Sequence, residues 1–462
     1  MALKTARGRV SVWARQAGLA FVTLTCAAAA PAVEAEPEPT REHPDAGPTN
    51  APATDPAPPA EPPGADPDLA ALQAEVAGPD VSSLDSGGPK LNLYGFADFT
   101  YTAQVGKVSP VAAWYPTFAI GNFNLYLSTE FTPTWRSLAE VRFLYLPNGQ
   151  LAAGDTFNPA AARVDTSTAD YADVNRPLHW GGVEIERIWL EHTISNLLTL
   201  RIGQWLTPYG IWNVDHGSPA IIGVFRPYIV GEGLFPERQT GIEGYGSFYV
   251  AATQVGYHLT LSNGRGPIDA YQDLDHNKAL GARLFVRNDS LLGTFTLGAS
   301  GYRGTYSDRP GNPLVFGADG LSLSKVLTAR YRELALAADL KWEWDELLLQ
   351  SEVVVSDQAY LDELRPAALP IPGLPPSYIP DSRRKGFYVL AAYRTPWWNI
   401  MPFVVWQMYK NPLVTNANEV QFGLNVRVLP EIVLKAQFDH VWFPQGVLGK
   451  VDYVTTQAAW SF

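Results

Sequence analysis

The chain has 462 residues, a formal net charge of −12, 46% hydrophobic and 12% aromatic residues, and a single cysteine. One cysteine excludes a disulfide framework and a thiolate metal site, and the acidic balance argues against nucleic acid as a partner. No stretch has the 18 or more uncharged apolar residues of a transmembrane helix, which leaves a soluble exported domain or a membrane β-barrel.

Residues 1–32 are a predicted signal peptide, with a basic start, an apolar run too short to span a bilayer, and small residues after it. We expect cleavage after Ala32 or Ala35. Cys26 raises the alternative of a lipoprotein, but Thr25 stands where a lipobox needs a smaller residue. The mature chain is therefore expected to be exported and, without Cys26, to contain no cysteine.

Residues 33–88 are predicted to be a disordered periplasmic linker. The segment is rich in Pro, Ala and Glu, a composition that cannot bury a core and gives an extended, semi-rigid spacer. Within it, residues 68–77 place Leu69, Leu72 and Val76 at helical spacing, but one heptad is too short to be stable alone, so we interpret this patch as a nascent helix. The linker is a tether that could contact a periplasmic partner or the cell wall.

From Leu91 onward the sequence alternates between apolar and polar residues over lengths typical of strands. The first such segment sets Leu93 and Phe99 against Asn92 and Asp98, which predicts a strand with one apolar and one polar face. The alternation loses its phase between residues 184 and 192, where we expect a bulge. About 16 strands, within a range of 14 to 18, are predicted, at 91–105, 118–131, 135–146, 183–195, 197–207, 239–250, 253–262, 278–287, 292–305, 330–344, 346–357, 384–395, 400–410, 418–429, 431–443 and 451–462.

The connections between these segments alternate between tight turns and long loops. Tight turns on one rim, long loops on the other and an even number of strands are typical of an outer-membrane barrel. The last strand ends on Phe462, similar to the terminal aromatic signal of such proteins, and Trp397 and Trp398 lie where an interfacial aromatic girdle is expected. We therefore predict an all-β, antiparallel transmembrane β-barrel over 89–462, integral to the outer membrane of a Gram-negative cell and in contact with its lipid and lipopolysaccharide.

The longest apolar connection runs from Pro208 to Glu237, between two predicted strands. Loops of this length are normally functional or disordered, and disordered loops are poor in aromatic and branched apolar residues. This one contains Phe225, Tyr228 and Phe235 among many apolar residues. We expect loop 208–237 to fold back into the barrel, where its apolar side chains pack against the inner wall.

Three segments resemble the phosphate-selective porin O/P-like family: RIGQ at 201–204, TPYG at 207–210 and FPERQTGI at 235–242. They are similar to the strand, long loop and returning strand of that family. The resemblance implies a homotrimer of 16- to 18-stranded barrels whose third extracellular loop is folded inside as the constriction. The phosphate preference of its best-known members rests on a ladder of lysines, and lysine is scarce here, so the resemblance leaves the selectivity open.

A 16-stranded barrel is wide enough for an aqueous channel, and rings of charge at a constriction set ion preference. The predicted function is passive diffusion of small hydrophilic solutes and ions, constricted by loop 208–237. An anion- or phosphate-selective channel of the same fold is the alternative, because several arginines could form a guanidinium track. The expected constriction and selectivity residues are Asp215, His216, Arg226, Glu232, Glu237 and Arg238 of the loop region and Arg136, Glu140, Arg142, Arg201, Arg283 and Arg287 of the wall.

Two other classes of function compete with a channel. Asp215 and His216 are neighbours in the long loop and could activate water in an outer-membrane enzyme, but chance alone explains one such pair, so we expect no catalytic residues. A structural barrel that does not conduct is the second rival. Asp273, Asp275 and Asn277 begin like a calcium loop that lacks its glycine and terminal glutamate, so neither a metal nor another cofactor is expected.

Overall fold

The computed structural model describes residues 88–106, 116–145, 180–214, 217–265, 275–308, 315–316, 323–324, 329–361, 365, 380–412, 416–444 and 449–462. The predicted signal peptide and the linker up to residue 87, with its helical patch at 68–77, lie outside these residues. Asp215, His216 and Asp273 lie outside them as well.

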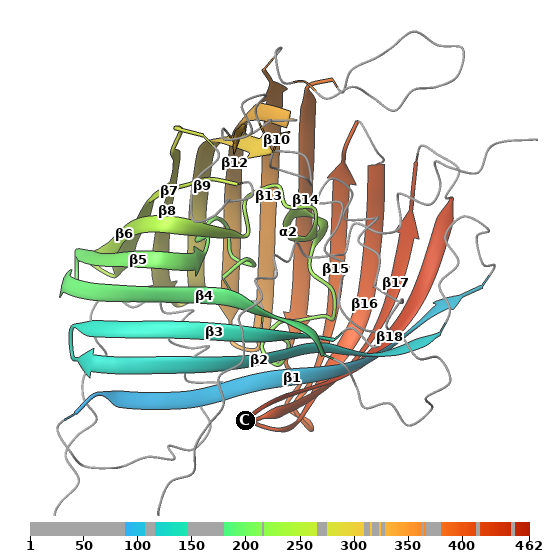
Figure 1. The fold of residues 1–462 in the computed structure, drawn as a ribbon. Helices are drawn as coiled ribbons and strands as arrows, with labels where there is room; N and C mark the ends of the chain where they lie inside the picture. Colours follow the sequence, from blue (N-terminus) through green and yellow to red (C-terminus); the bar gives the residue numbers. More distant parts are fainter. Residues whose placement is uncertain are drawn as a thin grey trace, which may run out of the picture.

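Sixteen antiparallel strands close into a single barrel, and a separate two-stranded sheet pairs β10 with β11 (Figure 1). The barrel strands are β1 (Lys90–Val105), β2 (Thr117–Thr132), β3 (Trp135–Tyr145), β4 (Trp180–Ser195), β5 (Leu198–Leu206), β6 (Arg238–Val250), β7 (Thr253–Ser262), β8 (Ala279–Ser290), β9 (Gly293–Asp308), β12 (Ala329–Trp344), β13 (Leu347–Tyr360), β14 (Ser382–Tyr393), β15 (Ile400–Lys410), β16 (Asn416–Leu429), β17 (Ile432–Trp442) and β18 (Lys450–Ser461). The additional elements are β10 (Val315–Phe316), β11 (Leu323–Ser324) and the one-turn helix α2 (Tyr228–Gly231).

The two ends of the chain close the barrel. Strand β1 pairs with β18, with Phe96 opposite Ser461 and Val105 opposite Asp452. Beside this ladder, the Gly95 amide donates to the Phe462 carbonyl at 2.8 Å and the Phe462 amide donates to the Gly95 carbonyl at 3.0 Å. Because no strand edge is left in the ladder, the backbone of every barrel strand has a partner on both sides.

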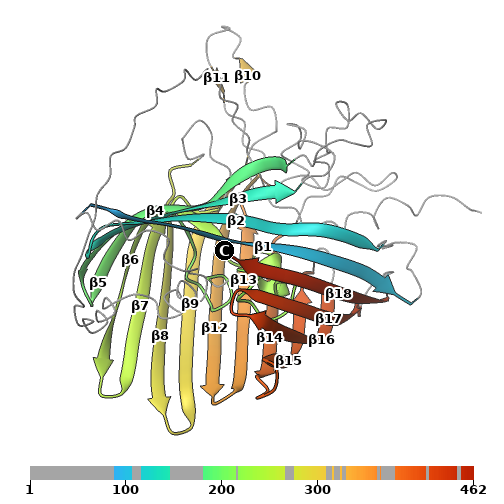
Figure 2. The ribbon, with the colours of Figure 1, turned by 90° about the horizontal axis from the view of Figure 1, so that it is seen from below.

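The strands tilt strongly, so that β1–β5 run across the view in Figure 1 and β12–β18 run roughly upright, and both groups are seen from below in Figure 2. Side chains alternate across the wall. On β15, Phe403 and Val405 are buried, whereas Val404 and Trp406 are exposed on the outer face. Because backbone groups within a bilayer must be paired internally, a closed barrel with an apolar exterior is a structure that can span it. The chain therefore forms a closed antiparallel β-barrel with an apolar exterior, as the sequence predicted.

None of the helices in the described part of the chain is long and apolar enough to cross a bilayer.

The sequence predicted the number of strands and the position of each within a few residues. It did not predict α2 or the small β10–β11 sheet, because four residues of helix and pairs of two residues give no periodic signal. The expected bulge lies in β4, where the register against β3 shifts between Glu140 and Val141. There, the consecutive residues Glu186 and Arg187 are both buried on the inner face.

Candidate functional site

The candidate site is the barrel lumen together with the long connection between β5 and β6. The two ends of this connection are tied together, since the Thr207 amide donates to the Glu237 carbonyl at 3.0 Å. The side-chain amide of Asn213 donates to both the Thr207 and the Glu237 carbonyls at 2.9 Å. The loop therefore leaves and rejoins the wall at one place, and the residues between these two ends can extend across the barrel.

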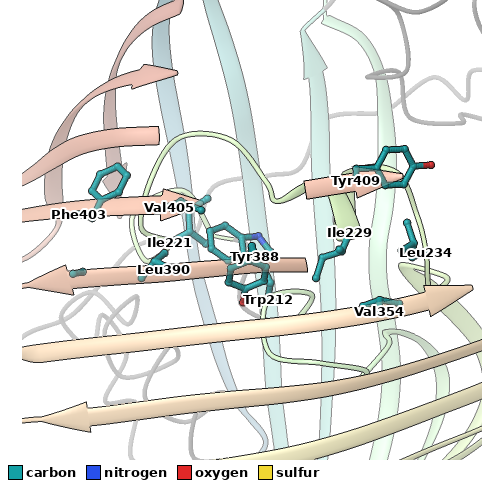
Figure 3. Packing of buried hydrophobic residues seen from close by; sticks show 11 residues of the cluster. Trp212, Ile221, Ile229, Leu234, Val354, Tyr388, Leu390, Phe403, Val405 and Tyr409 are labelled. Atoms are coloured by element: carbon teal, nitrogen blue, oxygen red, sulfur yellow. The ribbon is translucent and has the colours of Figure 1, made fainter. Parts of the chain in front are cut away.

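The apolar residues of the loop pack against strands on the other side of the barrel. Trp212, Ile221 and Ile229 of the loop form one buried cluster with side chains from β13, β14 and β15 (Figure 3). In that cluster the rings of Trp212 and Tyr388 meet edge to face, with centroids 5.9 Å apart. The loop thus has an apolar face that is covered by the inner wall.

Polar side chains of the same walls bind the loop backbone. The Glu352 carboxylate of β13 accepts hydrogen bonds from the Trp212 amide at 2.8 Å and the Tyr388 hydroxyl at 2.7 Å. On β17, the Lys435 ammonium donates to the Ile221 and Gly223 carbonyls, both at 2.7 Å. These contacts satisfy loop donors and acceptors that would otherwise be buried without partners.

Two glutamines connect the loop to a pair of buried carboxylates. The Val224 amide donates to Gln437 Oε1 at 2.8 Å, and Gln437 Nε2 donates to Asp439 at 2.5 Å. The Tyr228 amide likewise donates to Gln407 Oε1 at 2.8 Å, and Gln407 Nε2 donates to Glu419 at 2.8 Å. In each case a wall glutamine accepts from the loop and donates to a carboxylate.

On β1, Asp98 holds the loop more directly. Its carboxylate accepts from the Ser218 hydroxyl at 2.5 Å and from the side-chain amide of Asn122 at 2.6 Å. Asp98, Glu352, Glu419 and Asp439 are all buried, and none of the four forms an ion pair with an arginine or lysine in the described part of the chain. Carboxylates without a cationic partner therefore lie where the loop is anchored.

The wall formed by β3 to β7 carries a network of ion pairs instead. Arg201 lies at its centre, donating to Glu191 and to Glu243, each at 2.8 Å. Its guanidinium also lies over the rings of Trp189 and Tyr245, 4.5 Å and 4.9 Å from their centroids. A planar, always charged guanidinium suits such a stacked and doubly paired position.

Further ion pairs lie on both sides of Arg201 along this wall. Arg136 shares Glu191 with it at 2.6 Å, and His258 Nδ1 lies 2.9 Å from Glu243. Toward the long-loop rim, further pairs join Arg187 to Glu140, Arg142 to Glu186, and Arg238 to Glu184, Glu186 and Glu237. The bulge in β4 supplies both Glu186 and Arg187 to this wall, which strict alternation would not allow.

In most of these pairs the arginine side chain is more exposed than its carboxylate partner, and the exception is Arg238 with Glu237, at 19% against 26%. The Arg136 side chain is 24% exposed against 1% for Glu191, and Arg142 is 16% exposed against 1% for Glu186. The same order holds for Arg187, Arg201 and Arg283 with their partners. The carboxylates of these pairs are therefore the buried partners, and the arginine side chains keep the contact with solvent.

The remaining residues expected at the constriction are distributed between the loop and more distant strands. Arg226 pairs with Glu237 within the loop region, Arg283 pairs with Asp339 at 2.9 Å, and Arg287 lies 3.8 Å from Asp289. Burial raises the pKa of the Glu232 carboxyl, an effect that the charge of Arg384 opposes. The structure thus joins Arg136 to Arg201 through Glu191, and Arg142 to Arg238 through Glu186. Arg283 and Arg287 lie outside both groups.

The loop approaches the ion-pair wall near its first residues. Pro208 and Val214 face Arg201, Tyr245 and His258 across a cavity of about 30 Å³, roughly the space of one water molecule. The wall and the start of the loop therefore lie almost in contact at this level.

Several functional side chains were not predicted. The sequence did not single out Gln407 and Gln437, although both lie within predicted strands, because only the folded loop shows which wall residues it meets. Among the residues that the structure describes, no group of three or more histidine, cysteine, aspartate or glutamate side chains could hold a metal ion.

Comparison with models of protein families and with curated proteins gives no match. Among solved structures, the chain is similar to OmpT, an outer membrane protein of Vibrio cholerae in its trimer form, with 10% identity and a TM-score of 0.48 over 81% of this chain and 100% of that one. The anion-selective porin from Comamonas acidovorans has the same four values. The outer membrane channel DcaP of Acinetobacter baumannii has 13% identity and a TM-score of 0.47 over 82% and 99%. The barrel is established by its strand pairing, independently of these distant likenesses.

Proposed function

We propose that this protein is a porin: a passive diffusion channel for small hydrophilic solutes and ions, narrowed by loop 208–237. The observation that carries the proposal is the path of the loop, which starts and ends beside β5 and β6 yet binds the inner faces of β13 to β17. A barrel of 16 strands leaves an aqueous lumen, and a loop that crosses it reduces the open cross-section.

The charges of the lumen favour weak selectivity. Arg136, Arg142, Arg201, Arg226 and Arg283 each have a carboxylate partner, so these five arginines do not form an uncompensated row of cations. Paired charges keep a lumen hydrated without creating a strong barrier to either sign of ion. A general channel for hydrophilic solutes is therefore the main proposal.

An anion preference is the second candidate. It is supported by the greater exposure of the Arg136 and Arg142 side chains compared with their carboxylate partners, since arginine N–H groups are strong donors to a passing anion. The resemblance to the phosphate-selective porin O/P-like family points the same way but rests on the segments at 201–204, 207–210 and 235–242 alone. As part of the same proposal we infer a homotrimer, to be tested by the size of the unheated protein in detergent.

Conductance of the purified protein in a planar bilayer tests the main proposal. We expect stepwise currents, and a larger step after deletion of Ser218–Val230, because the deleted residues cross the lumen. Unheated electrophoretic mobility and circular dichroism show whether the deleted form is still a folded barrel.

The same measurement separates the rival functions. A folded barrel without current supports a structural role, and an unchanged step after the deletion means that the loop does not limit the flow. Replacement of Asp215 and His216 by alanine should leave the current intact, whereas a hydrolytic activity that disappears with these residues contradicts a simple channel.

A further inference from the structure

The turn between β14 and β15 has an unusual backbone for its residues. Trp398 and Asn399 have φ values of +54° and +49°, and the Ile400 amide donates to the Trp397 carbonyl at 3.3 Å. Two central residues in the left-handed region define a type I′ turn, which favours Asn-Gly. A tryptophan in that region is a strained choice, and strain of this kind is retained where the side chain has a role.

The strained turn holds two indole rings outside the barrel. Trp397 is 71% exposed and Trp398 is 84% exposed. Thr395 stabilises the turn, since its amide donates to the Ile400 carbonyl and its hydroxyl lies 2.8 Å from the same oxygen. The two rings are therefore held at the short-turn rim by a hydrogen-bonded turn.

The rings border a groove of about 490 Å³ on the outer surface, lined by Thr395, Trp397, Trp398, Ile400, Pro402 and Leu424. Pro402 and Leu424 stand opposite each other on β15 and β16, and Leu424 is on the face that points away from the lumen. Farther along these strands the same face exposes Val404, Trp406 and Phe422. The groove is thus continuous with the membrane-facing surface of the barrel and ends at the rim.

We propose that this groove binds one acyl chain of a phospholipid from the periplasmic leaflet of the outer membrane. In outer-membrane barrels the rim with short turns faces the periplasm, so the groove opens toward that leaflet. An aliphatic chain matches the apolar lining, and indole rings prefer the level of the headgroups, where their N–H groups stay hydrated. The left-handed turn raises Trp398 to that level and makes one side of the groove.

Retention of lipid by the detergent-solubilised barrel tests this site. Wild-type protein is mixed with dioleoylphosphatidylglycerol, and the bound molecules are counted by native mass spectrometry. The test variant is Trp398→Asn, which removes the ring and places a residue suited to the left-handed turn. The matched control is Trp344→Asn, at the end of β12, an exposed tryptophan of the same rim that does not line the groove.

We expect the wild type and Trp344→Asn to retain one tightly held lipid that Trp398→Asn has lost. The melting temperature of lipid-free Trp398→Asn should be equal to or above that of the wild type, since the turn is relieved of strain, and added lipid should raise it less. Lipids brominated along the chain should quench tryptophan emission more in the wild type than in Trp398→Asn.

Equal retention and equal quenching in all three proteins would overturn the proposal. It would also be overturned if Trp398→Asn changed the oligomer size in lipid-free detergent, because the groove would then belong to an interface between copies. Neither outcome depends on whether the barrel conducts.

Discussion

Arg201 is the residue on which the ion-pair wall depends most. It is nearly buried and serves two buried carboxylates, Glu191 and Glu243. Removing one partner of a buried pair leaves charge without compensation and typically costs about 3–5 kcal/mol. We therefore expect Arg201→Met to lower the free energy of unfolding by roughly that amount, as measured by chemical unfolding in lipid vesicles.

The control for Arg201 is Arg287, an arginine with a loose and exposed partner. Arg287 lies 3.8 Å from Asp289, whose side chain is 68% exposed. Exposed pairs contribute about 0–1 kcal/mol, so Arg287→Met should have little effect on unfolding. If both variants lowered the free energy of unfolding by similar amounts, the position of Arg201 between two carboxylates would contribute nothing to stability.

The sequence identified Arg201 and Arg142 as residues of the polar face, but it could not identify all of their partners. Glu186 and Arg187 are adjacent in β4, and alternation assigns one of them to the lipid side. The bulge turns both inward, and the side-chain amide of Gln204 donates to the Ile185 carbonyl at 2.8 Å. The lost alternation between residues 184 and 192 predicts a bulge in this strand, but the residue at which it lies depends on pairing with the neighbouring strand, which a single strand's pattern does not report.

At the scale of elements, the strands could be predicted and the loop contacts could not. Each barrel strand shows its two-residue period locally, because one face meets lipid and the other meets the lumen. The contacts of loop 208–237 join it to strands more than a hundred residues away, as between Trp212 and Glu352 or Val224 and Gln437. Such contacts follow from the closure of the barrel and leave no local signal.

Glu352 provides a test of how firmly the loop is held as an element. Its replacement by alanine leaves the Trp212 amide buried without an acceptor, at a cost of about 1–3 kcal/mol. We expect hydrogen exchange of the loop around Trp212 to become about 5–150-fold faster, since that range of free energy corresponds to such a ratio. Hydrogen-exchange mass spectrometry of the barrel in detergent measures this change.

Asp357→Ala is the matched control for Glu352→Ala. Asp357 lies on the same strand, β13, but it pairs with Arg383, which is exposed, and it does not contact the loop. Exchange around Trp212 should be unchanged in this variant. A loop that exchanges at the wild-type rate without Glu352 would mean that its apolar face alone holds it.

At the scale of the whole molecule, the lumen has two different walls. The wall of β13 to β17 is covered by the loop and contains the carboxylates Glu352, Glu419 and Asp439, whereas the wall of β3 to β7 remains a sheet of ion pairs. In the proposed channel, a solute that passes the loop meets the arginines of the other wall. We therefore expect the selectivity to respond to the second wall more than to the first.

Arg136 and Arg142 allow that response to be measured without breaking the network. When Arg136 and Arg142 are replaced by glutamine, Glu191 still forms its ion pair with Arg201, and Glu186 still forms its ion pair with Arg238. Loss of two partly exposed cations should lower the anion/cation permeability ratio about two- to fivefold, which corresponds to about 0.5–1 kcal/mol. The reversal potential in a KCl gradient gives this ratio, and Arg383→Gln, an exposed arginine of the rim, should leave it unchanged.

Salt concentration distinguishes a charge effect from a change in shape. The Debye length shortens from about 10 Å at 0.1 M to about 3 Å at 1 M ionic strength, so the difference between the wild type and Arg136→Gln/Arg142→Gln should shrink at high salt. If the two proteins still differed in permeability ratio at 1 M salt, the cause would be a wider lumen and not the loss of two positive charges. A ratio that is unaffected at low salt would exclude the two arginines from selectivity and leave the general channel as the proposal.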